Sequence, residues 1–158
     1  MRTETKVKFV SRAEARRMIE SGVFSSGTVD LVSISDTNKE KREMQDLWSS
    51  YKGERDAAIF LNFLDINDIA CQLTDAKVNK ILEFTNKTIE KQKDLVVHCY
   101  MGISRSGAVA KFVNEYWGLG DRYLEDYSGH NLFVYYTLLE KAGVPTLRSY
   151  YTQLEQVK

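Results

Sequence analysis

The sequence has few of the residues that cross-link a chain, kink it or give it a net charge. Its 158 residues include one proline, two cysteines and two histidines, and 22 basic residues balance 22 acidic ones. A chain without net charge has no general attraction to nucleic acid or to an anionic membrane, so we expect neither as a partner. No apolar run of about 20 residues could span a bilayer. The start, MRTETKVKFV, lacks the apolar core of a signal peptide, and we expect a cytoplasmic protein.

The scarcity of cysteine and histidine also argues against a metal site. Cys71 and Cys99 could form one disulfide at most, whereas secreted chains of this length often carry several. Neither a C-x-x-C nor an H-x-x-x-H spacing occurs, and the neighbours His98 and Cys99 would point to opposite sides of an extended segment. We therefore expect neither a metal nor another cofactor.

Apolar runs alternate with segments of helical periodicity along the whole chain. No repeat or Pro/Gly-rich linker interrupts it, so residues 1–158 are expected to form one domain. The expected strands cover residues 6–10, 28–34, 57–64 and 95–98. The expected helices cover residues 12–20, 39–50, 75–91, 106–117, 131–141 and 146–156. This alternation predicts an α/β fold, with a central, mostly parallel sheet of about four or five strands flanked by helices.

The segment after the strand at 95–98 carries the strongest motif. In parallel α/β sheets, binding sites form beyond the carboxyl ends of the strands. The motif reads His98-Cys99-Tyr100-Met101-Gly102-Ile103-Ser104-Arg105-Ser106-Gly107. A tight loop that enters a helix turns its backbone N–H groups inward and can bind an anion, with help from the helix dipole. Gly102 permits the positive φ angle that such a turn requires.

Three side chains of this motif have the chemistry to react with a phosphate ester. Arg105 can bind two phosphate oxygens at once through its planar guanidinium. A helix N-terminus and a nearby cation stabilise the thiolate of Cys99, which is the nucleophilic form. Ser106 can donate a hydrogen bond to the sulfur and help it leave in a second step. A single strand-ending cysteine is usually an inert core residue, but this combination predicts a catalytic phosphate pocket.

Residues 98–107 match the signature of the protein tyrosine phosphatase superfamily, and the short chain resembles the compact dual-specificity branch. It is also similar to small bacterial and phage tyrosine-phosphatase-like proteins in three outer segments, Phe-Val-Ser-Arg at 9–12, Ser-Ile-Ser-Asp at 33–36 and Phe-Leu-Asp-Ile at 63–66. The resemblance extends to about Gly118. It implies the fold of that family and a two-step, metal-independent reaction through a phosphocysteine intermediate. The implied partners are phosphorylated proteins or peptides, chiefly with phosphotyrosine, and anions such as phosphate and vanadate.

The resemblance also implies an aspartate that protonates the leaving group and later activates water. The family carries this residue on a loop that precedes the cysteine. Asp65 directly follows the third apolar run, whereas Asp68 stands 31 positions before Cys99 and suits the dual-specificity spacing better. We favour Asp65 and keep Asp68 as the alternative; Asp36, at the end of the second strand, is a weaker third candidate.

The remaining residues of the motif are expected to bind substrate or to support the loop. The substrate-binding set is Tyr100, Met101, Gly102, Ile103, Ser104 and Arg105. The variable positions of the loop carry no charge, which argues against an inositol phospholipid as substrate, and a nonbasic loop gives no support for RNA. The ring of His98, by the family's pattern, hydrogen-bonds backbone near the cysteine.

Two further side chains of the sequence, those of Cys71 and His130, are also chemically reactive types. Some relatives trap the oxidised nucleophile with a second cysteine, but we expect Cys71 to be a small core residue and His130 to have no chemical role.

The main alternative function is a phosphate-binding pseudophosphatase with little turnover. A rhodanese-like sulfurtransferase or an arsenate reductase fits the Cys-x5-Arg-Ser-Gly pattern poorly. Low-molecular-weight phosphatases carry their loop at the N-terminus, unlike this chain.

Overall fold

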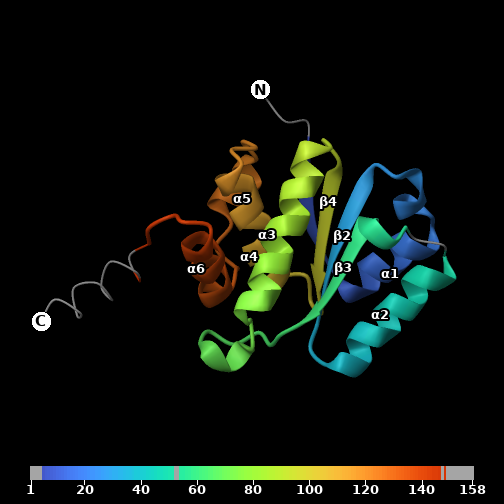
Figure 1. Cartoon of the computed structure of the whole chain (residues 1–158), viewed down its shortest axis with the longest axis horizontal. Helices are drawn as coiled ribbons and strands as arrows, with labels where there is room; N and C mark the ends of the chain where they lie inside the picture. Colours follow the sequence, from blue (N-terminus) through green and yellow to red (C-terminus); the bar gives the residue numbers. More distant parts are fainter. Residues whose placement is uncertain (1–4, 52–53, 147, 149–158) are drawn as a thin grey trace, which may run out of the picture.

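Four parallel strands form one sheet in the computed structural model, which describes residues 5–51, 54–146 and 148 (Figure 1). The strands are β1 (Val7–Ser11), β2 (Val29–Ser35), β3 (Ala58–Asn62) and β4 (Asp94–Cys99). Their order across the sheet is β1-β4-β2-β3, so β4 pairs with β1 on one side and with β2 on the other. The expected α/β fold is confirmed, with four strands.

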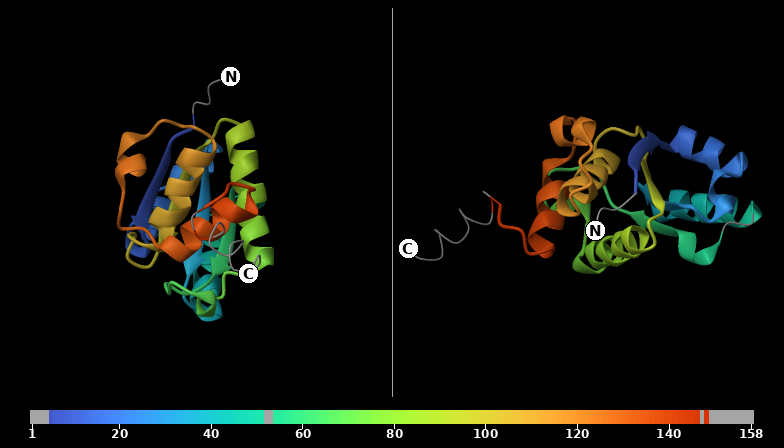
Figure 2. Two further views of the ribbon diagram at one scale, coloured as in Figure 1. Left: turned by 90° about the vertical axis from the view of Figure 1, so that its left-hand side faces the viewer. Right: turned by 90° about the horizontal axis from the view of Figure 1, so that it is seen from above.

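Helices cover both faces of this sheet, with α1 and α2 on one face and α3, α4, α5 and α6 on the other (Figure 2). The helices are α1 (Arg12–Glu20), α2 (Asn38–Ser50), α3 (Asp75–Glu90), α4 (Arg105–Tyr116), α5 (Arg122–Asp126) and α6 (Leu132–Lys141). Three short 3-10 turns join them, namely η1 (Val23–Ser26), η2 (Arg55–Ala57) and η3 (Ile69–Cys71).

The two faces of the sheet belong to two separate cores. Leu31 of β2 packs with Met44 and Trp48 of α2, whereas its neighbour Val32 packs with Val109 of α4 in the other core. This split follows from the strand itself, because successive side chains point to opposite faces. The four parallel strands therefore lie between two layers of helices, with their carboxyl ends at one edge of the sheet.

Most helices begin where the sequence predicts a cap. The side chains of Ser11, Thr37, Thr74 and Asn131 each accept a hydrogen bond from the backbone amide three residues later. Such caps satisfy amides that have no partner within the helix. The four helices also start at the edge of the sheet where the strands end (Figure 1).

The structure differs from the sequence-based expectation at two points. The third strand ends at Asn62 and not at residue 64, because the amide of Leu64 bonds to the carbonyl of Cys71 within the following loop. The short helix α5, capped by the side chain of Asp121, was not expected. The expected helix at 146–156 lies almost entirely outside the described residues.

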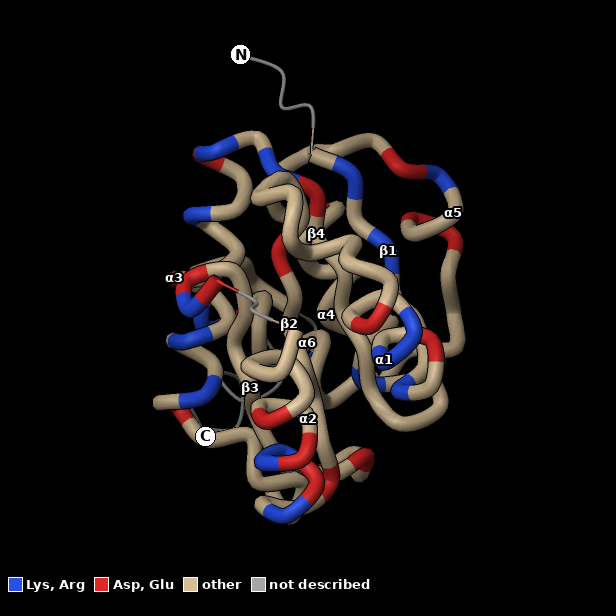
Figure 3. Tube along the Cα trace, turned by 90° about the vertical axis from the view of Figure 1, so that its right-hand side faces the viewer, with Lys and Arg blue, Asp and Glu red and all other residues tan. Residues whose placement is uncertain are grey.

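Charge is mixed over the surface. Lys and Arg alternate with Asp and Glu along α1, α2 and α3 (Figure 3). In the described part of the chain, no helix combines the length and apolar character needed to cross a bilayer.

Candidate active site

The motif loop joins the middle of the sheet to α4. Cys99 is the last residue of β4, and Arg105 is the first residue of α4. The loop between them lies against the end of β1, where the amide of Arg12 donates to the carbonyl of Tyr100 at 3.1 Å. Gly102 has a φ of 72°, and a Cβ at this position would lie 2.3 Å from the backbone nitrogen of Ser11. The loop can therefore approach β1 only because this residue is glycine.

Cys99 and Ser106 form a buried pair at the base of the loop. The Sγ of Cys99 lies 3.1 Å from the Oγ of Ser106, and both residues are buried. A thiolate can only accept a hydrogen bond, so the hydroxyl of Ser106 would donate to it. Residues of β4 and α4 thus place the hydroxyl of Ser106 within hydrogen-bond distance of the sulfur.

The guanidinium of Arg105 is hydrogen-bonded through its Nη1 but not through its Nε. Its Nη1 donates to the carbonyl of Phe63 at 2.7 Å and pairs with Oδ1 of Asp36 at 2.6 Å. The side chain is only 5% exposed, and its Nε is buried without a hydrogen-bond partner among the described residues. A buried donor without a partner is costly, so this Nε–H matches an acceptor that a bound oxyanion would supply.

His98 links the loop to the neighbouring strand β2. Its Nδ1 lies 3.2 Å from the carbonyl of Cys99, and its Nε2 lies 2.6 Å from the Oγ of Ser33. Because a carbonyl only accepts, Nδ1 carries the proton and Nε2 accepts from the serine hydroxyl. Burial lowers the pKa of His98 to about 4. The ring is therefore neutral near pH 7 and contacts the backbone of Cys99.

Asp65 lies beside the loop. Its Oδ1 accepts from the Oγ of Ser104 at 2.7 Å and from Nδ2 of Asn131 at 2.8 Å. These two hydrogen bonds join the loop after β3, the motif loop and the start of α6 in one place. Asp65 is exposed, so its carboxyl group lies at the surface beside the motif loop and not in the core.

The other two aspartates have different partners. Oδ1 of Asp68 accepts from the amide of Ala70 at 2.8 Å and caps η3. Asp36 pairs with Arg105. Of the three acid candidates, Asp65 alone is hydrogen-bonded to a residue of the motif loop between Cys99 and Arg105, within the described chain.

Two residues of the site could not be assigned from the sequence. Tyr127 donates from its hydroxyl to the carbonyl of Ile103 at 2.8 Å, and burial raises its pKa, so it stays a donor. Its ring fills the space beside Gly107, where a Cβ would lie 2.5 Å from a ring carbon. Asn131 caps α6 with its side chain, and its backbone amide donates to the carbonyl of Ser104 at 3.0 Å. The run of small residues Ser106-Gly107-Ala108 is the feature of the sequence that could have indicated close packing at Gly107.

The remaining predicted residues divide between the surface and the core. Tyr100, Met101 and Ile103 are exposed at the opening of the loop. Cys71 and Cys99 are both buried and free of disulfide. Burial raises the pKa of the Cys71 thiol, which fits a core residue. The described residues contain no group of three or more His, Cys, Asp or Glu side chains placed to hold a metal ion.

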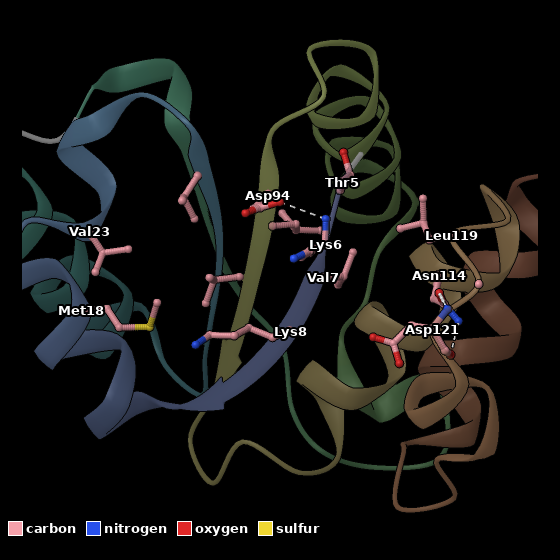
Figure 4. A pocket seen from close by; sticks show the side chains of 14 residues that line it. Thr5, Lys6, Val7, Lys8, Met18, Val23, Asp94, Asn114, Leu119 and Asp121 are labelled. Carbon is pink, nitrogen blue, oxygen red and sulfur yellow. Dashed lines mark hydrogen bonds between the residues drawn. The ribbon is translucent and has the colours of Figure 1, made fainter. Parts of the chain in front are cut away.

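A separate cavity of about 620 Å³ lies beside β1, near the opposite end of the sheet (Figure 4). Side chains of Met18 and Val23 line one side, and those of Asn114, Leu119 and Asp121 line the other. None of its lining residues comes from the segment 99–106. This cavity is therefore distinct from the motif loop that follows Cys99.

Solved structures of phosphatases share this fold. PTPMT1 has a TM-score of 0.51 and 16% sequence identity, and the match covers 87% of this chain and 89% of that chain. PTPMT1 in complex with PI(5)P gives a TM-score of 0.51 at 16% identity, covering 89% of this chain and 92% of that chain. The Cydia pomonella PTP-2 phosphatase gives a TM-score of 0.52 at 13% identity, covering 93% of this chain and 82% of that chain.

These matches concern the fold, because the identities are low. No protein-family model matches the chain, and no curated protein matches it in sequence. The chain has the α/β fold of the tyrosine and dual-specificity phosphatases over most of its length, as its resemblance to them implied.

Proposed function

We propose that this chain hydrolyses phosphomonoesters through a phosphocysteine intermediate, with protein phosphotyrosine as the main substrate class and phosphoserine and phosphothreonine as further substrates. The observation that carries this proposal is the free Nε–H of buried Arg105 beside the Cys99–Ser106 pair. A guanidinium fixed at Nη1 presents its remaining donors as a preorganised site for phosphoryl oxygens.

The reaction proceeds in two displacement steps at phosphorus. The Cys99 thiolate attacks the phosphorus atom, the P–O bond to the leaving group breaks, and Asp65 gives its proton to the departing oxygen. Asp65 then takes a proton from water, which attacks the phosphocysteine. The S–P bond breaks, inorganic phosphate leaves, and the Ser106 hydroxyl stabilises the released thiolate.

Asp65 is the acid we propose, and its contacts support the choice. Two hydrogen bonds to Oδ1 fix the carboxyl group against the motif loop and leave Oδ2 to carry the proton. Asp68 caps η3, and Asp36 accepts from the guanidinium of Arg105, so both carboxylates act as acceptors elsewhere.

The uncharged loop supports a protein substrate over a phosphoinositide. One of the similar structures is a complex with PI(5)P. In this chain, positions 100–104 read Tyr-Met-Gly-Ile-Ser and carry no lysine or arginine to bind additional phosphates.

Turnover of p-nitrophenyl phosphate in the presence of EDTA tests the reaction. We expect activity in the wild type and its loss in Cys99→Ser and in Arg105→Ala. Activity that survives Cys99→Ser would refute the mechanism. A wild type that binds vanadate without turnover would instead be a pseudophosphatase, the alternative function.

A leaving-group comparison tests the acid. The variant Asp65→Ala should lose far more rate on phenyl phosphate than on p-nitrophenyl phosphate, because a poor leaving group depends more on protonation. Asp68→Ala is the matched control and should change both rates equally little. The reverse pattern would transfer the role to Asp68.

A further inference from the structure

Exposed apolar side chains gather on the segments that carry the proposed site. Six of the ten large apolar side chains that are exposed in the described chain lie on the three segments that meet there. They are Tyr100, Met101 and Ile103 of the motif loop, Ile66 and Ile69 of the loop after β3, and Leu132 at the start of α6. Single exposed apolar residues are ordinary, but a cluster of them marks an interaction surface.

Hydrogen bonds bring these three segments together. Nδ2 of Asn131 donates to the carboxylate of Asp65 and, at 3.3 Å, to the carbonyl of Ile66. The amide of Asn131 donates to Ser104, and Ser104 in turn donates to Asp65. The carbonyl of Ile66 belongs to this hydrogen-bond network. Ile103 and Leu132 are the sequence neighbours of Ser104 and Asn131, which also belong to it. We call Tyr100, Met101, Ile103, Ile66 and Leu132 the apolar rim.

The charge around the rim narrows the choice of partner. The segments 65–72, 99–104 and 127–133 contain no lysine or arginine, and their charged residues are Asp65 and Asp68. An anionic membrane is recognised by clusters of basic residues, and an acidic peptide would be repelled by the carboxylate of Asp68. The rim fits a segment that is apolar and not acidic.

We infer that the substrate is a protein segment whose phosphorylated residue is flanked by apolar side chains. An extended peptide advances about 3.3 Å per residue, so neighbours on both sides of the phosphorylated residue cross the rim while the phosphate reaches Cys99. This inference rests on the proposed function and adds the sequence context that the site selects. Side chains exposed by 38% to 64% can each lose further surface to such a partner.

Three phosphotyrosine peptides of equal length test the inference. The phosphotyrosine is flanked by leucine and valine in the apolar peptide, by serine and asparagine in the polar peptide, and by aspartate and glutamate in the acidic peptide. We expect kcat/KM to be about tenfold higher for the apolar peptide than for the acidic one. Equal values, or a preference for the acidic peptide, would overturn it.

Variants of the rim make the test specific. The double variant Ile66→Ser/Leu132→Ser should lose most of the preference for the apolar peptide. Its rate on p-nitrophenyl phosphate should stay unchanged, because that small ester has no flanking residues to contact these two side chains and both substitutions keep the backbone carbonyl of Ile66. Val23→Ser is the matched control, since Val23 is similarly exposed but lines the distant cavity beside β1. A preference that survives the double variant, or is lost equally in the control, would overturn the inference.

Two further outcomes separate this inference from the proposed function. Turnover of p-nitrophenyl phosphate without discrimination among the peptides would overturn the rim alone. No turnover of either kind would overturn the proposed function and the inference with it. Sedimentation of the wild type, but not of the double variant, with phosphatidylcholine–phosphatidylserine vesicles would identify a lipid surface as the partner and would also overturn it.

Discussion

The close approach of the motif loop to β1 makes Gly102→Ala a decisive substitution. Gly102 has a φ of 72°, which costs an L-residue roughly 1–2 kcal/mol. The added Cβ would also lie 2.3 Å from the nitrogen of Ser11 and 2.4 Å from the carbonyl carbon of Val10. Carbon contacts are normally about 3.5–4.0 Å, so backbone on one side must move. Overpacking of this kind adds about 1–3 kcal/mol.

A second glycine of the same conformation provides the control. Gly118 has a φ of 62°, and a Cβ there would meet nothing within 4 Å. Gly118→Ala should therefore lower the free energy of unfolding by roughly 1–2 kcal/mol, and Gly102→Ala by about 2–5 kcal/mol. Urea unfolding followed by circular dichroism measures both values.

Activity should separate the two variants more clearly than stability. A displacement of the loop by about 1 Å can cost on the order of a hundredfold in rate. We expect Gly102→Ala to lose most of its turnover of p-nitrophenyl phosphate and Gly118→Ala to keep it. Equal stability and equal activity of the two variants would contradict a close approach of Gly102 to β1.

Three further substitutions probe the contacts around the motif loop. Asp36→Asn should lower kcat/KM by up to about fivefold, since a partly exposed ion pair contributes up to about 1 kcal/mol. The loss should be the same for phenyl and p-nitrophenyl phosphate, and a larger loss on the poorer leaving group would make Asp36 the acid. Tyr127→Phe removes the hydrogen bond to Ile103 and should lower stability by about 1 kcal/mol in urea unfolding; the exposed Tyr123→Phe should not, and equal effects would contradict this. The pKa of His98 is about 4 in the folded chain and 6.5 in the reference state, so the unfolded chain binds the proton first as the pH falls. Stability from this group is present above pH 6.5 and falls towards pH 4 by up to about 1.4 kcal/mol per pH unit. Urea unfolding at several pH values should show a weaker dependence in His98→Asn than in the wild type, and identical slopes would argue against the neutral buried ring.

The proposed reactive centre could be predicted from the sequence because its residues are close together in the chain. Cys99, Arg105 and Ser106 lie within one strand–loop–helix segment, and the geometry of such a segment follows from its own residues. The apolar runs and capping residues likewise predicted the alternating elements, since burial and caps act over a few residues. The short helix α5 escaped notice because five residues carry too little periodic pattern.

The acid and the orientation of the arginine depend on contacts between distant parts of the chain. Asp65 and Asp68 differ by three positions in one loop, and what distinguishes them is the hydrogen bond of Asp65 to Asn131, 66 positions away. The ion pair between Asp36 and Arg105 joins the loops after β2 and β4. Parallel strands bring their carboxyl ends to one edge whatever their separation in sequence. Local patterns therefore predict the proposed nucleophile and phosphate-binding loop, while the packing of the sheet decides which side chains surround them.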